Sequence, residues 1–349
     1  MTTATSQAHE ERPDVLPIQH VQLTKAEQDS GQLSPENRKL AGFILTCRGY
    51  VVFKDAFRPD YIERIGREVS EIYEDCRATM GTVPTSTSPI AVHQVHESNV
   101  KRASFWYRES RWRIFPKLVA PMSDPEIMAN AFTTPIIEDL LGPDFYCKYL
   151  SSDTCVKGAI LQSPHSDIDG HGVFVNNVWK PRGLIVNIPT MLCGLHNGPI
   201  EVWPGGSHMF TAEIMKRYGI SPDVQDGRNP PVERLAEYLP SVKLTLRPGE
   251  IMIRDLHMWH RGTPNPTDKP RTMLTIGYFR GDHNYGYGDP SYNLDRSMFD
   301  NLSPRVKRMF EYHFSLKSTI RREQQKLRSA AKKAAKDFVK AGISKITGS

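Results

Sequence analysis

The stretch that decides the fold is PGEIMIRDLHMWHRGTPNPTDKPRTMLTIGYFR, residues 248–280. It opens on a Pro-Gly turn, and a loop rich in Gly and Pro separates two apolar runs that contain many β-branched and aromatic residues. Runs of this kind between turn signals are typical of short strands. The stretch therefore predicts two neighbouring strands whose ends meet at the loop Gly262–Pro270.

The same pattern of short apolar runs begins at about Tyr146. The other runs are FYCKYL, CVKGAILQ, GLIVNIPTML, GPIEVWPG and SVKLTL. Regularly spaced short strands with turn residues between them favour an antiparallel sandwich or jelly roll. We therefore expect a mainly β protein with flanking helices.

The flanking helices are expected in the N-terminal half of the chain. GYVVFKDAF (Gly49–Phe57) is a strand candidate, and a helix should begin near Pro59, where the residue types suit a first turn. Its apolar side chains fall on one helical stripe, namely Tyr61, Ile65, Val69, Ile72, Tyr73 and Cys76. A second helical stretch is expected over residues 124–142.

The chain is interpreted as one domain with two extensions. Residues 1–36 are polar and aperiodic, which predicts a disordered or loosely docked arm, and residues 37–300 are expected to form the β-rich domain. Residues 301–349 carry 13 Lys or Arg and 3 Asp or Glu, so the formal charge of +6 for the chain leaves −4 on the rest. The body is therefore not a basic nucleic-acid binder.

The basic C-terminal segment is expected to be helical, with Leu316, Ile320, Leu327 and Phe338 at helical spacing. It could pack on the β domain or on a second subunit, lie on a membrane surface, or contact nucleic acid. A solvated helix with one packed stripe is the favoured interpretation, and a homo-oligomer formed through this helix stays open.

The compartment is inferred from what the sequence lacks. No run approaches the roughly 20 apolar residues of a membrane span, and the N-terminus has no secretory signal. The five cysteines are scattered and form no CxxC pair, which predicts free thiols in the cytoplasm. They are Cys47, Cys76, Cys147, Cys155 and Cys193.

The stretch QSPHSDIDGHG (Gln162–Gly172) contains a candidate metal motif. On an extended strand, side chains alternate, so His165, Asp167 and Asp169 point to one side. One imidazole and one carboxylate from this set, with a second imidazole from elsewhere, would make the facial arrangement typical of non-haem Fe(II). His-x-Asp alone is a weak signal.

The second imidazole is expected from the first stretch. If residues 250–260 form one strand, His257 and His260 lie on opposite faces, so only one of them can be the ligand. Alternation does not say which. Arg271 opens the return strand, where its planar fork would suit a carboxylate held beside the metal.

Three segments in order, PHSD, NGPIEVWPGGSH and LHMWHRGTPNPTDKPR, resemble the phytanoyl-CoA dioxygenase family of Fe(II)/2-oxoglutarate-dependent oxygenases. FILTCRGYVVFKDAFRPDYIERIGREV also resembles the family's N-terminal strand and helix. The resemblance covers roughly Leu40 to Arg280. It implies a double-stranded β-helix (jelly-roll or cupin-like) core, with Fe(II), 2-oxoglutarate and O2 as cofactor and co-substrates.

The resemblance also assigns site residues. The family's His-x-Asp ligands match His165 and Asp167, its distal histidine matches His260, and its 2-oxoglutarate arginine matches Arg271. Gln162 is a candidate contact of the co-substrate.

The remaining candidates are ranked below these residues. His257 is off the family spacing and is expected to be structural, and Asp169 is the fallback carboxylate. His171, His196 and His208 are expected to be structural or hydrogen-bonded loop residues rather than ligands.

The implied reaction is the oxidation of an unactivated C–H bond of a small molecule, such as a natural-product or lipid-like intermediate, with release of succinate and CO2. Hydroxylation is the default outcome, and desaturation, epoxidation and rearrangement stay open. Related halogenases have a small residue in place of the carboxylate, so Asp167 argues against halogenation. The alternatives are a cupin-type metalloenzyme that does not use 2-oxoglutarate, and a non-catalytic protein that binds a partner through the basic helix.

One further segment could bear on the substrate. Lys101–Lys117 is dense in aromatic residues and arginines, so Arg108 or Arg111 could meet an anionic group of the substrate. The favoured alternative is an amphipathic segment whose aromatic side chains face the core.

Overall fold

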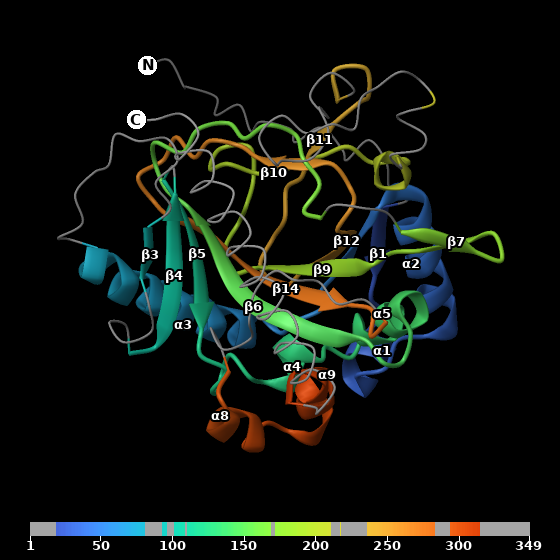
Figure 1. The fold of residues 1–349 in the computed structure, drawn as a ribbon, viewed down its shortest axis with the longest axis horizontal. Helices are drawn as coiled ribbons and strands as arrows, with labels where there is room; N and C mark the ends of the chain where they lie inside the picture. The colour runs from blue at the N-terminus through green and yellow to red at the C-terminus, as the bar shows by residue number, and fades with distance from the viewer. Residues whose placement is uncertain are drawn as a thin grey trace, which may run out of the picture.

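A nine-stranded sheet runs through the centre of the molecule, with a three-stranded sheet on one side of it and helices on the other (Figure 1). The computed structural model describes residues 19–80, 93–95, 101–108, 110–168, 172–210, 217, 236–282 and 294–314. Among these, neighbouring strands are antiparallel except β1 and β2. Two facing sheets of this kind form the double-stranded β-helix that the sequence predicts.

The strands of the large sheet, in spatial order, are β1 (His20–Gln22), β2 (Tyr50–Lys54), β12 (Ile251–Asp255), β9 (Gly183–Pro189), β14 (Arg271–Phe279), β6 (Tyr146–Cys155), β5 (Arg111–Pro116), β4 (Ala103–Arg108) and β3 (His93–Val95). The small sheet contains β11 (Val242–Lys243), β10 (Ile200–Val202) and β13 (His260–Gly262). A separate hairpin joins β7 (Val173–Val175) to β8 (Val178–Lys180).

The helices are α1 (Lys25–Ser30), α2 (Pro35–Arg48), α3 (Pro59–Met80), α4 (Pro125–Met128), α5 (Thr134–Leu141), α8 (Arg296–Asp300) and α9 (Pro304–Phe314), with a 3₁₀ turn at Ser207–Met209. In Figure 1, α3, α4 and α9 lie below the large sheet, whereas β10 and β11 lie above it. Within the described ranges, each helix is too short or too polar to cross a membrane.

The two faces of the large sheet have different neighbours because side chains alternate along each strand. On the outer face, Phe53, Ile253 and Ile276 join one core with Ile65 of α3. On the inner face, Met252 and Met273 pack with residues of the small sheet and its connections, including Val202 and Leu246. The inner face is therefore the side on which a site between the sheets is built.

The helix predicted to begin at Pro59 is confirmed as α3, and its whole predicted stripe is buried. The second predicted helical stretch is divided into α4 and α5. The break occurs because the Asn130 side chain accepts hydrogen bonds from the backbone N–H groups of Phe132 and Thr133. Pro135, which has no N–H to donate, then lies in the first turn of α5.

In the described part of the N-terminal arm, residues 19–36, the chain is ordered and docked rather than disordered, with β1, α1 and the start of α2. Thr24 and Glu27 form a capping box at the start of α1. The buried Glu27 carboxylate also accepts hydrogen bonds from the backbone of Ser34 and the side chain of Asn37. This polar network adds to the packing of Val21 and Leu23 in the main core, and the polar composition of the segment did not reveal either. The segments 1–18 and 315–349, with the predicted basic helix, lie outside the described residues.

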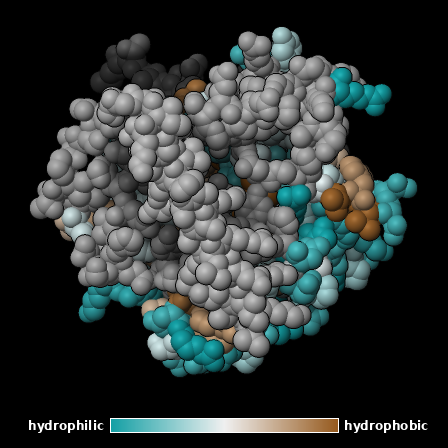
Figure 2. All heavy atoms as spheres, in the orientation of Figure 1, coloured by the Kyte–Doolittle hydropathy of each residue, from teal (hydrophilic) through white to brown (hydrophobic). Residues whose placement is uncertain are grey.

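The β7–β8 hairpin carries the most continuous apolar surface of the described residues. Four of its side chains, Val173, Phe174, Val175 and Val178, are exposed to between 45% and 59%. Figure 2 shows apolar residues at the right edge of the molecule, where Figure 1 places this hairpin. Its inner residue, Trp179, is buried instead and packs edge-on against Phe174.

Replacing Glu27 tests the polar network at the N-terminus. Burial opposes ionisation of Glu27, but hydrogen bonds from Thr24 and Ser34 lower its pKa to about 2, against an ordinary value of 4.5. Its contribution to stability is therefore present above pH 4.5 and is lost as the pH falls toward 2. Glu27→Gln should lower the free energy of unfolding by about 1–3 kcal/mol at pH 7, and by less at pH 3.

Urea unfolding at pH 7, 5 and 3 measures this difference. Glu63→Gln is the matched control because the Glu63 side chain is 73% exposed, and its loss should cost less than about 1 kcal/mol at each pH. A Glu27→Gln effect that is equal at all three pH values would contradict the assignment.

Candidate metal centre

The candidate site is built on a strand-like pairing between residues 162–167 and residues 256–262. His165 and His260 exchange both backbone hydrogen bonds, at 3.0 and 2.9 Å. On either side, Gln162 donates its N–H to Gly262 and Asp167 donates its N–H to Leu256. The His165–Asp167 segment thus extends the small sheet beside β13, and two regions almost 100 residues apart meet.

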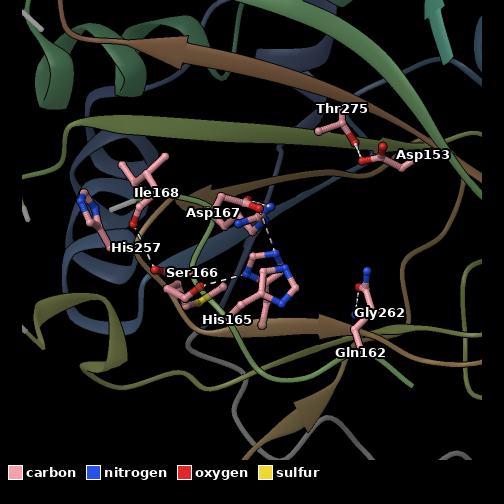
Figure 3. Close-up of polar contacts among 12 residues, drawn as sticks. Asp153, Gln162, His165, Ser166, Asp167, Ile168, His257, Gly262 and Thr275 are labelled. Carbon is pink, nitrogen blue, oxygen red and sulfur yellow. Dashed lines mark hydrogen bonds and ion pairs between the residues drawn. The ribbon is translucent and has the colours of Figure 1, made fainter. Parts of the chain in front are cut away.

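This pairing brings three predicted side chains together. Ligand atoms of His165, Asp167 and His260 all lie within 4.8 Å of one another, and this is the one such group of three or more His, Cys, Asp or Glu side chains among the described residues. The two imidazole centroids are 4.5 Å apart, and Nε2 of His260 lies 3.5 Å from Oδ1 of Asp167. Figure 3 shows Asp167 directed toward the imidazoles from the segment that also carries His165.

The imidazoles are oriented as metal ligands require. Nδ1 of His165 bonds to the Ser163 carbonyl at 2.8 Å, and Nδ1 of His260 bonds to the Met258 carbonyl at 3.0 Å. Because a carbonyl only accepts, each Nδ1 carries the proton and each Nε2 presents its lone pair. Burial, together with the neighbouring His260, lowers the pKa of His165 to about 4. The ring is therefore neutral at pH 7 and able to bind a cation.

The carboxylate is ionised and held on one side. Burial would raise the pKa of Asp167, but Arg254 and the two imidazoles lower it well below its usual value. Nη2 of Arg254 lies 2.5 Å from Oδ2 of Asp167, so Oδ1 is the oxygen nearer His260. Two imidazoles and one carboxylate are a donor set suited to a divalent iron ion with open positions.

Four polar side chains on the inner face of the large sheet face this group, and we call them the polar wall: Arg113, Asp153, Asn187 and Thr275. Arg113 pairs with Asp153 at 2.9 Å, Asp153 also accepts a bond from Thr275, and Asn187 donates to Thr275. Figure 3 shows the Thr275–Asp153 bond across from His165 and Asp167. Asp153, together with neighbours that include Tyr149 and Asp167, raises the pKa of Arg113.

Arg271 lies at the start of β14, as predicted, and is 6% exposed. Its Nε atom is buried without a hydrogen-bond partner. Its guanidinium forms no hydrogen bond or ion pair with any residue that the structure describes, and Cys193 is a near neighbour. A buried guanidinium without an anion is costly, which marks this position as a place for an anionic ligand.

Gln162 lies beside the site, but its side-chain oxygen accepts a bond from the Gly262 N–H at 2.8 Å. A Cβ atom at Gly262 would lie 2.6 Å from that oxygen and 2.6 Å from Nη1 of Arg111, so a larger residue there would displace the ends of both side chains. Arg111 itself donates to the carbonyls of Ile160 and Thr263. Both side chains therefore support the loop after β13.

The prediction of a single strand over residues 250–260 is wrong. His257 lies in a turn, so strand alternation does not set the direction of its side chain. β12 ends at Asp255, whose Oδ1 accepts bonds from both the backbone N–H and Nδ1 of His257. The other Asp255 oxygen accepts the indole N–H of Trp179 at 2.7 Å. Figure 3 shows His257 set apart from His165 and Asp167.

The other candidates do not join the group. His208 is buried and Nε2 bonds to the Thr46 carbonyl, while His196 is exposed in a loop. Asp169 and His171 lie outside the described residues. Of the three aromatic residues expected to face the core in Lys101–Lys117, Phe105 and Trp112 do so, whereas Trp106 is only partly buried and lies outside that core.

Arg254 and the Arg113–Asp153 pair were missed by sequence reasoning. A charged residue in the middle of the apolar run IMIRD is a signal, since an arginine is rarely buried unless it is paired. The sequence does not reveal the partners, because Asp167 lies 87 residues from Arg254 and Asp153 lies 40 residues from Arg113.

Comparison with known proteins gives a family and a set of solved structures. The family model described as "Phytanoyl-CoA dioxygenase (PhyH)" matches residues 45–273. One similar structure is the epimerase SnoN in complex with Fe3+, α-ketoglutarate and nogalamycin RO, with 16% identity, 74% of this chain and 94% of that chain covered, and a TM-score of 0.45. Another is HygX from Streptomyces hygroscopicus with nickel and 2-oxoglutarate bound, with 12% identity, 71% and 87% covered, and a TM-score of 0.46.

Replacing His257 tests the separation of the two histidines. His257→Ala removes the Asp255 bond and leaves a small cavity, so the free energy of unfolding should fall by about 1–3 kcal/mol. Binding of Co(II), followed by absorption spectroscopy, should be retained because His257 does not face the other imidazoles. His260→Ala is the matched variant and should lose Co(II) binding. The opposite pattern would make His257 the ligand.

Proposed function

The chain belongs to the phytanoyl-CoA dioxygenase family and is an Fe(II)/2-oxoglutarate-dependent oxygenase, and we propose that it oxidises an unactivated C–H bond of a polar small molecule. Hydroxylation is the proposed outcome. The observation that carries the proposal is the group of two imidazoles and one ionised carboxylate on adjacent, paired segments.

The proposed iron ligands are His165, Asp167 and His260. The donor chemistry supports this assignment, because both Nε2 atoms are free to coordinate while both Nδ1 atoms are held by backbone carbonyls. Three protein donors on one side leave the remaining coordination positions for the co-substrate and for O2.

Arg271 is proposed to hold the far carboxylate of 2-oxoglutarate. Arg254 and Arg113 are each paired with an aspartate, whereas Arg271 has no described anionic partner. A planar guanidinium binds a carboxylate through two parallel hydrogen bonds, which fixes the orientation of the co-substrate as well as its position. Gln162 remains a proposed neighbour of the co-substrate through its amide group.

When bound, iron and 2-oxoglutarate supply the oxidation: one atom of O2 enters succinate as CO2 leaves, and the other enters the substrate. The protein contributes orientation and the exclusion of water. His165 and His260 hold their ligand atoms rigidly through the paired backbone between them. Asp167 supplies the single negative charge of the ligand set.

The polar wall supports a polar substrate rather than a bare hydrocarbon chain. The Arg113 and Asp153 side chains are 40% and 29% exposed, so they are accessible to a ligand beside the metal group. Ser151 Oγ and Asn187 Oδ1 on the same inner face are buried without hydrogen-bond partners in the described part of the chain. Such groups favour a ligand that brings hydroxyl, amide or charged groups to them.

Anaerobic addition of Fe(II) and 2-oxoglutarate tests the proposed centre. The wild-type protein should develop a weak visible charge-transfer band, because the keto acid chelates the iron. His165→Ala, Asp167→Ala and His260→Ala should each abolish the band by removing a ligand. Arg271→Ala is the control that separates metal binding from co-substrate binding. This variant should still bind Fe(II), but the same band should appear only at a 2-oxoglutarate concentration roughly tenfold or more higher.

Absence of the band in the wild-type protein would overturn the proposed function. Metal binding that is intact in all four variants would overturn the ligand assignment. An unchanged response to 2-oxoglutarate in Arg271→Ala would instead favour a metalloenzyme that does not use this co-substrate.

Substrate-stimulated succinate formation tests the substrate class. Hydroxylated, amide-bearing or charged natural products should stimulate turnover of 2-oxoglutarate, whereas free fatty acids and alkanes should not, because they leave the polar wall unsatisfied. Arg113→Leu should reduce the stimulation and leave the charge-transfer band unchanged. Stimulation by hydrocarbons alone would contradict this proposal.

A further inference from the structure

Arg254 is a buried cation in the middle of an otherwise apolar strand. It is 5% exposed, and its neighbours across the sheet are Tyr50 of β2 and Ile185 of β9. Its side chain lies on the inner face, where it reaches Asp167. A residue of this size and charge needs a specific reason to occupy such a position.

The contact with Arg254 gives the two carboxylate oxygens of Asp167 different neighbours. Oδ2 is occupied by Nη2 of Arg254 at 2.5 Å, while Oδ1 lies 3.5 Å from Nε2 of His260, on the side of the imidazoles. Only Oδ1 is therefore presented to the imidazole pair.

Stability does not explain the arginine. Its Nε and Nη1 atoms are buried without a partner among the described residues, so this ion pair does not recover the full cost of burying a guanidinium. Buried ion pairs of this kind are often no more stabilising than apolar residues of similar volume. The residue is better explained by what it does to Asp167.

We infer that Arg254 is a positioning residue that restricts Asp167 to one coordinating oxygen. The inference rests on the proposed function. A carboxylate can bind a metal through one oxygen or through both, and two-oxygen binding would occupy a position that the co-substrate needs. Because Arg254 retains Oδ2, the protein supplies three donor atoms, and the positions opposite them stay open.

Charge makes this role distinguishable from a merely structural one. A guanidinium beside the ligand carboxylate repels a divalent cation and draws negative charge away from Oδ1. Removing it should therefore leave metal affinity unchanged or increased, because Asp167 gains a second free oxygen. Loss of a structural support would instead weaken metal binding.

The experiment compares the full-length wild-type protein with Arg254→Met and Arg254→Lys. Methionine fills the space without charge, and lysine keeps the charge on a side chain that offers one donor centre instead of a planar fork. Co(II) alone is titrated first, and 2-oxoglutarate is then added to the Co(II) protein. Circular dichroism and thermal unfolding establish that each variant is folded.

For Arg254→Met, we expect the Co(II) dissociation constant to stay within about threefold of wild type or to fall, with a changed Co(II) absorption spectrum. The affinity for 2-oxoglutarate should fall by about tenfold or more, in the range typical of residues that orient a metal ligand. Arg254→Lys should recover part of that affinity.

Two results would overturn the inference: unchanged 2-oxoglutarate affinity in a folded Arg254→Met protein, or a loss of Co(II) affinity of about tenfold or more. Failure of the proposed function is distinguishable, because the wild-type protein would then bind no Co(II) or would not respond to 2-oxoglutarate.

Discussion

Two reciprocal backbone hydrogen bonds between His165 and His260 hold the candidate site together. They act before any metal is present, because they set the separation of the imidazoles through the backbone rather than through the side chains. The Nδ1 bonds to Ser163 and Met258 then set the rotation of each ring. A site arranged in this way needs little rearrangement to bind an ion, so most of the binding free energy is available for affinity.

The inner face of the large sheet combines apolar packing with paired charges. Met252 and Met273 pack toward the small sheet. Arg254, two residues beyond Met252 on β12, and Arg113 on β5 each meet an aspartate. Each ion pair offsets part of the desolvation cost of its buried charges and fixes the directions of the two side chains. Arg271 has no such partner among the described residues.

Sequence reasoning found the residues that local periodicity can place. His165 and Asp167 are two positions apart on an extended segment, so alternation put them on one side, and the structure brings them to within ligand distance of His260. Prediction from periodicity failed at residues 255–257, where a side chain ends a strand. Asp255 ends β12 by accepting the N–H of His257, and no apolar period reports such a turn.

Contacts between distant segments were also beyond the sequence. The Arg254–Asp167 and Arg113–Asp153 pairs join different strands, and their partners depend on the register of the sheet. Residues 20–36 combine the pairing of β1 with β2 and two core side chains, Val21 and Leu23, with hydrogen bonds to the buried Glu27 carboxylate, which has no apolar signature.

The edges of the nine-stranded sheet have a consequence for behaviour at high protein concentration. The outermost strands, β1 and β3, are each three residues long in the described chain, although β6 in the interior of the sheet has ten. A neighbouring molecule would thus find few free backbone N–H and C=O groups on which to add a strand. The sheet is wide enough to build a site and yet offers little template for growth into intermolecular fibres.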